Sequence, residues 1–448
     1  MCRTDERGNT AVGIYDWSAR VFGLQELVRH QASCRCDLCG DQAFERTAWY
    51  NAQPDGPVYL DGWALVYKGE VPEDADITFE AGTIGISDEY FLHPIDGVFL
   101  NGSYSPVNEG TGSQPDVIYK QIPRIRSVKL PEGLKYIDSY FLPGTRITEI
   151  DFPSTLEYIG RSSFGNSEIT RLTLPKSVKT LPLRVFAEMR KLRRVEAPGV
   201  TEIGDAAFQN CMSLETVNFG GSVQSVGKNV FYNTPSLKTV DFTGSLRSAD
   251  EMAFTRSGCE YVFIPSGLER ISNMMFYQCE NLKSMVVPDP VESIGNFAFY
   301  ECGDMERIVL PSTLQTIGEA TFVHCASLKE IYCKAKTPPT TEGDVGIFAY
   351  CDKKNMVLYV PVGSGEAYRN AMHWKSIGNI VEVDYGEVGD CDIDADGQVD
   401  TQDINLLINM QLGVNYTPEQ RLLGDVNTDG SVDVADLNRI INAMMTGQ

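Results

Sequence analysis

Two stretches near the end of the chain carry side-chain oxygens at alternate positions. Residues 392–403 read DIDADGQVDTQD and residues 425–436 read DVNTDGSVDVAD, so the second repeats the first at an offset of 33. Alternating carboxylates bring several oxygens to one centre, the Gly at the sixth place permits a sharp turn, and the twelfth residue closes the shell. This spacing indicates a loop that wraps a calcium ion, present twice.

Each oxygen-bearing position in these loops has an expected role. The first loop would use the side chains of Asp392, Asp394, Asp396 and Asp403, the carbonyl of Gln398, and Asp400 through water. The second would use Asp425, Asn427, Asp429 and Asp436, the carbonyl of Ser431, and Asp433 through water. The nine aspartates of the two sets repel one another, so we expect binding of two calcium ions to be coupled to folding. An acidic, solvated tail is the alternative interpretation, but two in-register copies rarely arise by chance.

Histidines and clustered cysteines are the other residue types that could do chemistry. The four histidines are scattered along the chain, at His30, His93, His324 and His373. The sequence contains no HExxH, phosphate-binding glycine loop or paired-carboxylate motif outside the two acidic loops. We therefore expect no catalytic residues and predict that the protein is not an enzyme. The stretch CRCDLCG at residues 34–40 could hold zinc or form a redox pair, depending on what surrounds it.

A repeat of 22 or 23 residues organises most of the chain. Segments such as LETVNFGGSVQSVGKNVFYNTPS and MERIVLPSTLQTIGEATFVHCAS share the frame L-x-x-[IV]-x-[LF]-P-x-x-[LV]-x-x-[IV]-G-x-x-x-F-x-x-C. The aromatic position of the frame recurs at Phe164, Phe186, Phe208, Phe231, Phe254, Phe276, Phe299 and Phe322. One such unit cannot bury its apolar side alone, whereas stacked units can.

The apolar residues within a unit are spaced for extended chain, because those of LETVNF and VQSVG lie too close together for one helix face. We therefore predict a repeat solenoid that is mainly β with short helical or 3-10 turns, with a parallel sheet along one face and the phenylalanines stacked inside. Burial of each phenylalanine should contribute about 2 to 3 kcal/mol. The exposed strand positions carry Lys, Arg, Glu and Thr, which indicates a binding face but names no ligand.

The clustered cysteines fit this frame as a degenerate first unit. Cys36 and Cys39 fall on inward apolar positions of the frame, and Phe44 falls on its aromatic position. Only Cys34 lies outside the apolar frame. A single thiol makes a poor metal site, and the other two are expected to serve as small hydrophobic residues. Four cysteines follow the phenylalanine by three positions, namely Cys211, Cys279, Cys302 and Cys325. We expect them to form a reduced, buried ladder, although a bridge between neighbouring units is geometrically possible.

Composition narrows the classes of function. The formal charge of −23 over 448 residues argues against nucleic acid or an anionic membrane surface as a partner. No apolar run reaches the roughly 18 residues of a membrane span. The first residues, MCRTDERGNT, lack the apolar core of a secretion signal, so the protein is either cytoplasmic or has lost its true beginning. A repeat that starts near residue 24 favours the second interpretation.

A short amphipathic segment follows each acidic loop. Ile404, Leu407 and Ile408 are spaced i, i+3, i+4, and the second copy repeats them as Leu437, Ile440 and Ile441. Each acidic loop is followed by a helix, and no entering helix precedes the first loop, so each copy is half of an EF-hand. This pattern resembles a type I dockerin over residues 389–446. We assign a small all-α domain with two half EF-hands to residues 389–448. This resemblance implies docking to a cohesin-like scaffold module, often in polysaccharide-degrading assemblies. It also implies a partner-binding role for the tenth and eleventh loop positions, here Thr401 with Gln402 and Val434 with Ala435.

The repeat frame itself resembles the BspA-like leucine-rich repeats of bacterial surface proteins, over residues 24–383. Within this region we assign a hairpin and irregular repeat to 58–92, an insertion to 93–123 and a C-terminal cap to 333–383; residues 1–23 stay unassigned and 384–388 form a linker. The resemblance implies a secreted or cell-surface protein that binds a host protein or a glycan without catalysis. A carbohydrate-binding accessory of a polysaccharide-degrading assembly is the alternative function, and a glycoside hydrolase is the least favoured.

Overall fold

The computed structural model describes residues 51–69, 71–87, 125–242, 246–264, 267–383, 393, 401–412, 420, 424, 426, 432 and 434–446. The expected first repeat with its clustered cysteines, the insertion, the linker and two of the four histidines lie outside these residues.

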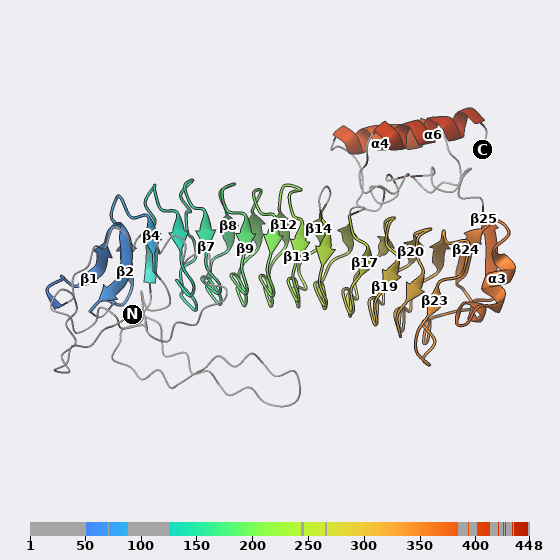
Figure 1. Cartoon of the computed structure of the whole chain (residues 1–448), viewed down its shortest axis with the longest axis horizontal. Helices are drawn as coiled ribbons and strands as arrows, with labels where there is room; N and C mark the ends of the chain where they lie inside the picture. The colour runs from blue at the N-terminus through green and yellow to red at the C-terminus, as the bar shows by residue number, and fades with distance from the viewer. Residues whose placement is uncertain are drawn as a thin grey trace, which may run out of the picture. The chain divides into compact units, whose positions relative to one another are not determined.

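The repeats form a regular series of rungs in which one strand per repeat contributes to a row of parallel strands, hydrogen-bonded in two groups of five (Figure 1). Its first half contains β8 (Arg171–Thr173), β10 (Arg194–Glu196), β12 (Thr216–Asn218), β14 (Thr239–Asp241) and β16 (Tyr261–Phe263). Its second half contains β18 (Ser284–Val286), β20 (Arg307–Leu310), β22 (Glu330–Cys333), β24 (Val357–Pro361) and β25 (Asn379–Val383). We call this row of strands the first sheet.

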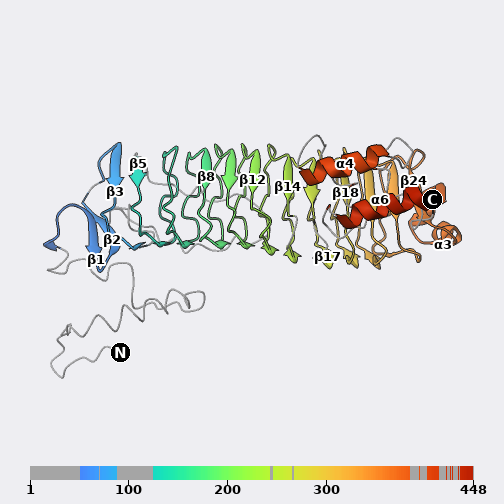
Figure 2. The ribbon, with the colours of Figure 1, turned by 90° about the horizontal axis from the view of Figure 1, so that it is seen from above.

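A second row of strands runs beside the first, which differs from the single sheet that the sequence predicted. The VQSVG part of each repeat forms its own two-residue strand, and these strands pair in parallel. They are β4 (Gly85–Ile86), β6 (Tyr136–Ile137), β7 (Tyr158–Ile159), β9 (Thr180–Leu181), β11 (Glu202–Ile203), β13 (Ser225–Val226), β15 (Ser248–Ala249), β17 (Arg270–Ile271), β19 (Ser293–Ile294), β21 (Thr316–Ile317) and β23 (Thr340–Thr341). Figure 2 shows the strands of successive rungs following one another along the solenoid. We call this row the second sheet.

Both ends of the described solenoid depart from the repeat. At the N-terminal end, β1 (Gly56–Leu60) and β2 (Trp63–Lys68) form an antiparallel hairpin, and β2 pairs in parallel with β4. Strands β3 (Ala75–Thr78) and β5 (Ile125–Lys129) also pair in parallel. At the C-terminal end, α3 (Gly365–Asn370) and the 3-10 turn η1 (Trp374–Ser376) separate β24 from β25. Trp374 and Tyr368 of this segment are fully buried, and these large side chains cover the C-terminal end of the solenoid core.

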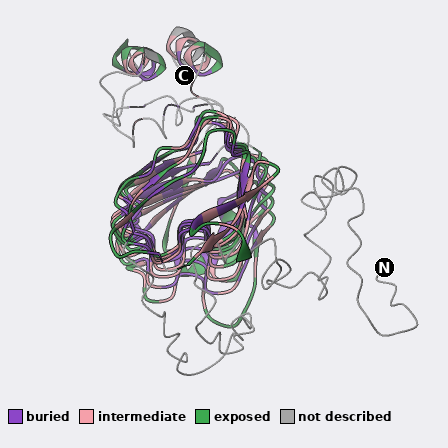
Figure 3. Ribbon diagram, turned by 90° about the vertical axis from the view of Figure 1, so that its left-hand side faces the viewer, coloured by how far each residue is buried: buried purple, intermediate pink, exposed green. Residues whose placement is uncertain are grey.

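The core lies inside the coil, as the alternation of strand side chains requires (Figure 3). All eight predicted phenylalanines are fully buried, and each ring stacks on the next at centroid distances of 5.2 to 6.0 Å. The ladder continues to Phe348 by stacking and to Phe141 by an edge contact. The predicted phenylalanine ladder is therefore confirmed and is longer than the repeat frame indicated.

The turns around each phenylalanine use left-handed backbone at residues other than glycine. The second residue after the ring has a positive φ in successive repeats, for example Asn210 (59°), Asn233 (57°) and Glu301 (57°). This conformation costs about 1 to 2 kcal/mol for most residues and least for Asn. Side chains at this position hydrogen-bond between rungs: Asn233 Nδ2 donates to Asn210 Oδ1 at 2.7 Å. These bonds help to hold a backbone shape that repeats along the whole coil.

The cysteines that follow the phenylalanines are buried and free. Each thiol donates a hydrogen bond to the carbonyl of a phenylalanine from an earlier repeat, as from Cys279 to Phe254 at 2.9 Å and from Cys325 to Phe299 at 3.1 Å. Burial raises the pKa of both thiols well above its usual range. A protonated, hydrogen-bonded thiol is a packing element rather than a nucleophile or metal ligand.

The C-terminal region contains α4 (Thr401–Leu412) and α6 (Val434–Thr446), which contact each other and share a small core. Leu407 and Ile440 are fully buried in it, as the amphipathic spacing predicted. Ile408 is exposed instead, and the loop residues Ile393 and Val426 contribute to the core. With so short a helix pair, residues from the loops must supply part of the apolar contact.

Candidate functional site

The strongest chemical feature of the C-terminal region is a buried carboxylate in the first turn of each helix. Asp403 of α4 is 1 % exposed and Asp436 of α6 is 0 % exposed, and the two occupy the same place in their repeats. The backbone N–H of Ile393 donates to Asp403 Oδ1 at 2.7 Å, so this carboxylate reaches back across the loop. Burial of an ionised carboxylate is costly unless cations or hydrogen-bond donors compensate it.

The other predicted calcium ligands lie outside the described residues. They are Asp392, Asp394, Asp396, Gln398 and Asp400 in the first loop and Asp425, Asn427, Asp429, Ser431 and Asp433 in the second. Within the described ranges, no group of three or more His, Cys, Asp or Glu side chains is gathered as a metal site would require. Asp403 and Asp436 nevertheless fit the role of closing residues, since both are turned away from water at the end of an acidic loop.

The residues expected to contact a partner lie at the beginnings of the two helices. Thr401 and Gln402 begin α4, Val434 and Ala435 begin α6, and all four are exposed. Val434 is 60 % exposed although it is apolar. The two helix starts therefore present different chemistry, a hydroxyl and an amide on α4 and two apolar side chains on α6.

The outward face of the first sheet is polar in its first half. Leu172, Val195 and Val240 point inward and are fully or nearly fully buried, so their strand neighbours point outward. The outward residues include Arg171, Arg194, Thr216 and Thr239 in one column and Thr173, Glu196, Asn218 and Asp241 in the next. This half agrees with the polar face predicted from the sequence.

In the second half of the same face, one column is apolar and aromatic, which the sequence prediction missed. The other column stays largely polar and carries Ser284, Arg307, Glu330, Val357 and Asn379. Phe263 of β16 lies in register with Asp241 but is only 6 % exposed. From β18 onward the apolar column consists of Val286, Val309, Tyr332, Tyr359 and Val381, which we call the apolar stripe. Tyr332 and Tyr359 stack at 4.4 Å, and the Arg307 guanidinium lies 5.7 Å from the Tyr332 ring centroid. Burial raises the pKa of Tyr332. The signal was present in segments such as RIVL and VLYV, whose outward residues include Val309 and Tyr359.

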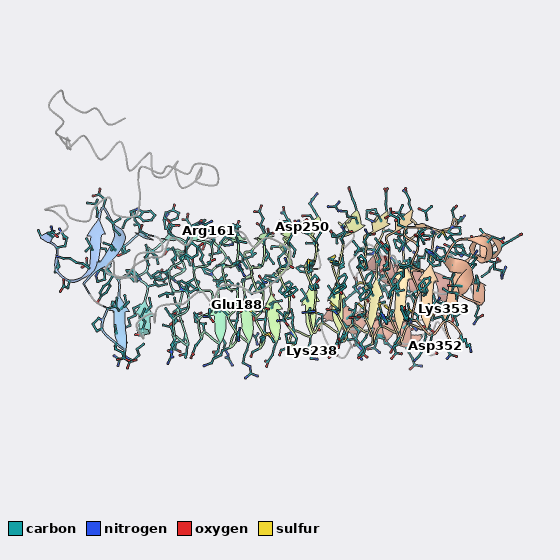
Figure 4. All side chains as sticks on the ribbon, turned by 90° about the horizontal axis from the view of Figure 1, so that it is seen from below. Arg161, Glu188, Lys238, Asp250, Asp352 and Lys353 are labelled. Carbon is teal, nitrogen blue, oxygen red and sulfur yellow. The ribbon has the colours of Figure 1, made fainter. Side chains whose placement is uncertain are left out.

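Ion pairs between neighbouring rungs cover other parts of the surface. Lys238 pairs with Glu260 at 2.8 Å, Lys283 pairs with Asp304 at 2.7 Å, and both pairs are largely exposed. Figure 4 shows Lys238 toward one edge of the solenoid and Arg161 and Asp250 toward the other. Exposed pairs of this kind contribute about 0 to 1 kcal/mol each to the stability of the fold. We interpret them as groups that keep the surface soluble and neighbouring rungs in register, not as catalytic groups.

Two of the four histidines can be placed in the structure. His324 stands between aromatic rings, stacked on Tyr350 at 4.4 Å and in edge contact with Tyr300 at 5.7 Å. It is part of a surface stack rather than a base beside a nucleophile. His373 precedes η1 with a φ of 64°, and burial with the nearby Lys353 and Lys375 lowers its pKa.

Parallel rungs of this length, with a stacked phenylalanine at each turn, define a leucine-rich repeat solenoid. The chain belongs to the BspA type leucine-rich repeat family, whose family model matches six copies over residues 115–238, 185–302 and 247–360, together more than half of the chain. Residues 390–445 match the dockerin type I domain. Both are non-catalytic types of domain. No curated protein matches the sequence.

Several solved bacterial proteins resemble the chain at low sequence identity. A leucine-rich repeat protein from Bacteroides ovatus is 18 % identical, with a TM-score of 0.46 over 69 % of this chain and 83 % of that one. One from Eubacterium ventriosum is 16 % identical, with a TM-score of 0.37 over 62 % and 76 %. The pneumococcal vaccine antigen PcpA is 14 % identical, with a TM-score of 0.35 over 72 % and 91 %. Within the described residues, no helix is long and apolar enough to cross a membrane.

Proposed function

We propose that this protein is a non-catalytic binding protein, secreted or displayed at the cell surface, whose solenoid binds a partner while its C-terminal domain docks to a cohesin-like scaffold. The observation that carries the proposal is the combination of a repeat solenoid, which bears an outward apolar stripe, with a calcium-loop domain that has two buried aspartates. Each part would supply one binding surface.

The C-terminal domain would bind two calcium ions, one in each acidic loop. Calcium prefers hard oxygen ligands, and the loops supply carboxylates, an amide and backbone carbonyls at the expected spacing. Asp403 and Asp436 would then close the shells, and the bound ion would compensate their burial. Because calcium would draw each loop onto its following helix, it would also hold the exposed starts of α4 and α6 in place for the partner.

The solenoid would bind a protein partner through the apolar stripe. Tyr and Arg are enriched at the energetic centres of protein interfaces, and Tyr332, Tyr359 and Arg307 lie together there. The Tyr332 ring already has Tyr359 and Arg307 beside it, so a partner would meet the edge of the ring rather than an open ring face. The polar half of the same sheet would form part of the rim.

Docking can be tested on the full chain by substituting the two buried aspartates. Asp403→Asn together with Asp436→Asn keeps the side-chain shape but removes a ligand charge from each loop, so calcium-dependent docking to a cohesin panel should be lost. Asp344→Asn, on an exposed loop of the solenoid, is the matched control and should dock like the parent chain. Cohesin binding that survives in the double variant, or that does not need calcium, would count against the proposal.

A further inference from the structure

A row of large aromatic residues lies on the outward face of the second sheet at its N-terminal end. Trp63, Gly85, Tyr136 and Tyr158 are in register on β2, β4, β6 and β7. The residue after each of them, Ala64, Ile86, Ile137 or Ile159, is fully buried. Since strand side chains alternate, the row faces outward. We call it the aromatic row.

The glycine in this row makes room for the indole. A Cβ atom on Gly85 would lie 2.5 Å from Cζ3 of Trp63, which is closer than side chains approach one another. The φ of Gly85 is not in the left-handed region, so the backbone does not require glycine there. The Trp63 ring therefore covers the position of the missing side chain, and it lies parallel to Tyr136 with 5.9 Å between ring centroids.

The fold does not require aromatic residues at these positions. Further along the second sheet, the same outward column carries Thr180, Glu202, Ser225, Ser248, Arg270, Ser293, Thr316 and Thr340. These residues sit on rungs of the same geometry without an aromatic ring. Tyr158 ends the row with 39 % exposure, and the corresponding residue of the next repeat is the small Thr180. Contiguous apolar groups at a surface, rather than single ones, mark contact sites, and the exposed Tyr158 ring continues the half-buried rings of Tyr136 and Trp63.

Charged groups of both signs lie beside the row. Lys135 pairs with Glu157 at 3.0 Å, and Asp138 lies in the electrostatic field of Arg161. The Arg161 guanidinium lies 5.4 Å from the Tyr140 ring centroid, and Figure 4 shows Arg161 at the edge of the solenoid. Burial raises the pKa of the Asp138 carboxyl. In a chain with a net charge of −23, these residues bring cations as well as carboxyl groups to this surface.

We propose that the aromatic row binds a neutral, extended oligosaccharide. The C–H face of a sugar ring can pack on the exposed Tyr158 ring, and the stacked rings of Trp63 and Tyr136 offer their edges beside it. The sugar hydroxyl groups can bond the Tyr158 hydroxyl, Asp138 and Arg161. The presence of charges of both signs favours a neutral ligand over an anionic glycan. The rungs from Gly85 to Tyr158 span about 10 Å at about 4.8 Å per strand, a length that suits a few linked sugar units.

This inference deepens the proposed function, because it adds a glycan site to the binding solenoid, at a different sheet from the apolar stripe. Trp, Tyr and Arg also occur at the centres of protein interfaces, so a protein ligand is the competing outcome. The polar groups that flank the row, and the exposed ring of Tyr158 beside a small threonine, favour the glycan.

The test uses the full chain and three neutral probes: cellohexaose, xylohexaose and mannohexaose, measured by titration calorimetry. At least one should bind, and Tyr158→Ala should weaken that binding at least tenfold. Gly85→Ala should weaken it similarly by displacing the Trp63 indole. Tyr350→Ala removes a more exposed tyrosine, 75 % accessible and remote in the repeat order, and should leave binding unchanged. Circular dichroism and thermal melting will exclude variants that do not fold.

Three results would overturn the proposal: no binding of any hexasaccharide, binding that both folded row variants retain, or binding of polygalacturonic acid in preference to the neutral probes. Capture of a protein by the parent chain but not by Tyr158→Ala, without saccharide binding, would replace the glycan with a protein ligand. Calcium-dependent docking should be unchanged in the row variants. Its failure in the parent chain would therefore count against the docking proposal alone.

Discussion

At the scale of single residues, the phenylalanine ladder is the main apolar component of the solenoid core. Phe254 lies in the middle of it, fully buried, with Phe231 at 5.2 Å and Phe276 at 5.3 Å between ring centroids. Stacked aromatic pairs contribute about 0.5 to 1.5 kcal/mol beyond the burial of their area. Because neighbouring rungs hold the backbone in place, the space left by a missing ring cannot easily collapse.

Phe254→Ala should therefore lower the free energy of unfolding by about 3 to 5 kcal/mol, as expected for a large truncation in a packed core. Urea denaturation followed by circular dichroism will measure the change. Val362→Ala, at a position that is 64 % exposed, is the control and should change the free energy by about 0.5 kcal/mol or less. A loss below about 1 kcal/mol for Phe254→Ala would mean that the ladder is not a main source of stability.

The periodic frame predicts residues whose role is repeated and misses residues whose role depends on a neighbouring rung. The phenylalanines and the cysteine ladder recur at fixed places, so their burial could be predicted. Gly85 looks like an ordinary loop glycine in the sequence, and its relation to Trp63 appears only when β2 and β4 are paired. Ile408 fits the helical spacing but is exposed, because the small core that α4 and α6 share does not extend over it.

At the scale of elements, the carboxylate of Glu382 stabilises the C-terminal end of the solenoid. Glu382 of β25 accepts hydrogen bonds from the backbone N–H groups of Gly363 at 3.0 Å and Gly365 at 2.8 Å. These bonds tie the last strand to the turn that leads into α3. They also favour the ionised form, so they lower the pKa of Glu382 below its ordinary value of 4.5.

Glu382→Gln should lower the melting temperature at pH 7. A carboxyl whose pKa is lower in the folded than in the unfolded state stabilises the fold above its unfolded pKa, and this contribution is lost as the pH falls through its folded pKa. The difference in melting temperature between the variant and the parent chain should therefore shrink as the pH falls below about 4.5. Glu366→Gln, exposed on α3, is the control. A difference in melting temperature that stays constant with pH would contradict this role of Glu382.

The division of each repeat into two strands is also decided at this scale. The spacing of LETVNF and VQSVG indicates extended chain for both segments, but it does not tell whether the second segment pairs with its counterparts. The second segment does pair with its counterparts, because every rung has nearly the same length. Each VQSVG segment therefore lies in register with the corresponding segment of the next repeat. The second sheet and the aromatic row upon it follow from that pairing.

At the scale of the whole molecule, the two parts of the chain should respond differently to calcium. The solenoid has its own continuous core, whereas α4 and α6 share a core of a few side chains and carry buried aspartates. So small a core gives little stability by itself, and calcium should provide the rest.

Addition of calcium to metal-stripped protein should raise helicity and protect residues 390–445 from proteolysis. The β-sheet signal and the protease resistance of the solenoid should not change. Circular dichroism and mass spectrometry of limited digests will measure both responses, and magnesium serves as the control ion because it fits such loops less well. If the C-terminal region is equally helical and protected without calcium, the coupling of binding to folding is wrong.

The sequence by itself determined the repeat, the stacked phenylalanines, the two acidic loops and the family. Each of these features appears in the sequence as a local pattern that recurs at a fixed interval. Only the tertiary structure decided the second sheet, the apolar stripe and the aromatic row. These depend on which residues of different repeats lie side by side. A single strand of two or three residues carries too little pattern to reveal its neighbours, and the surface chemistry of a solenoid arises only when the rungs are stacked in register.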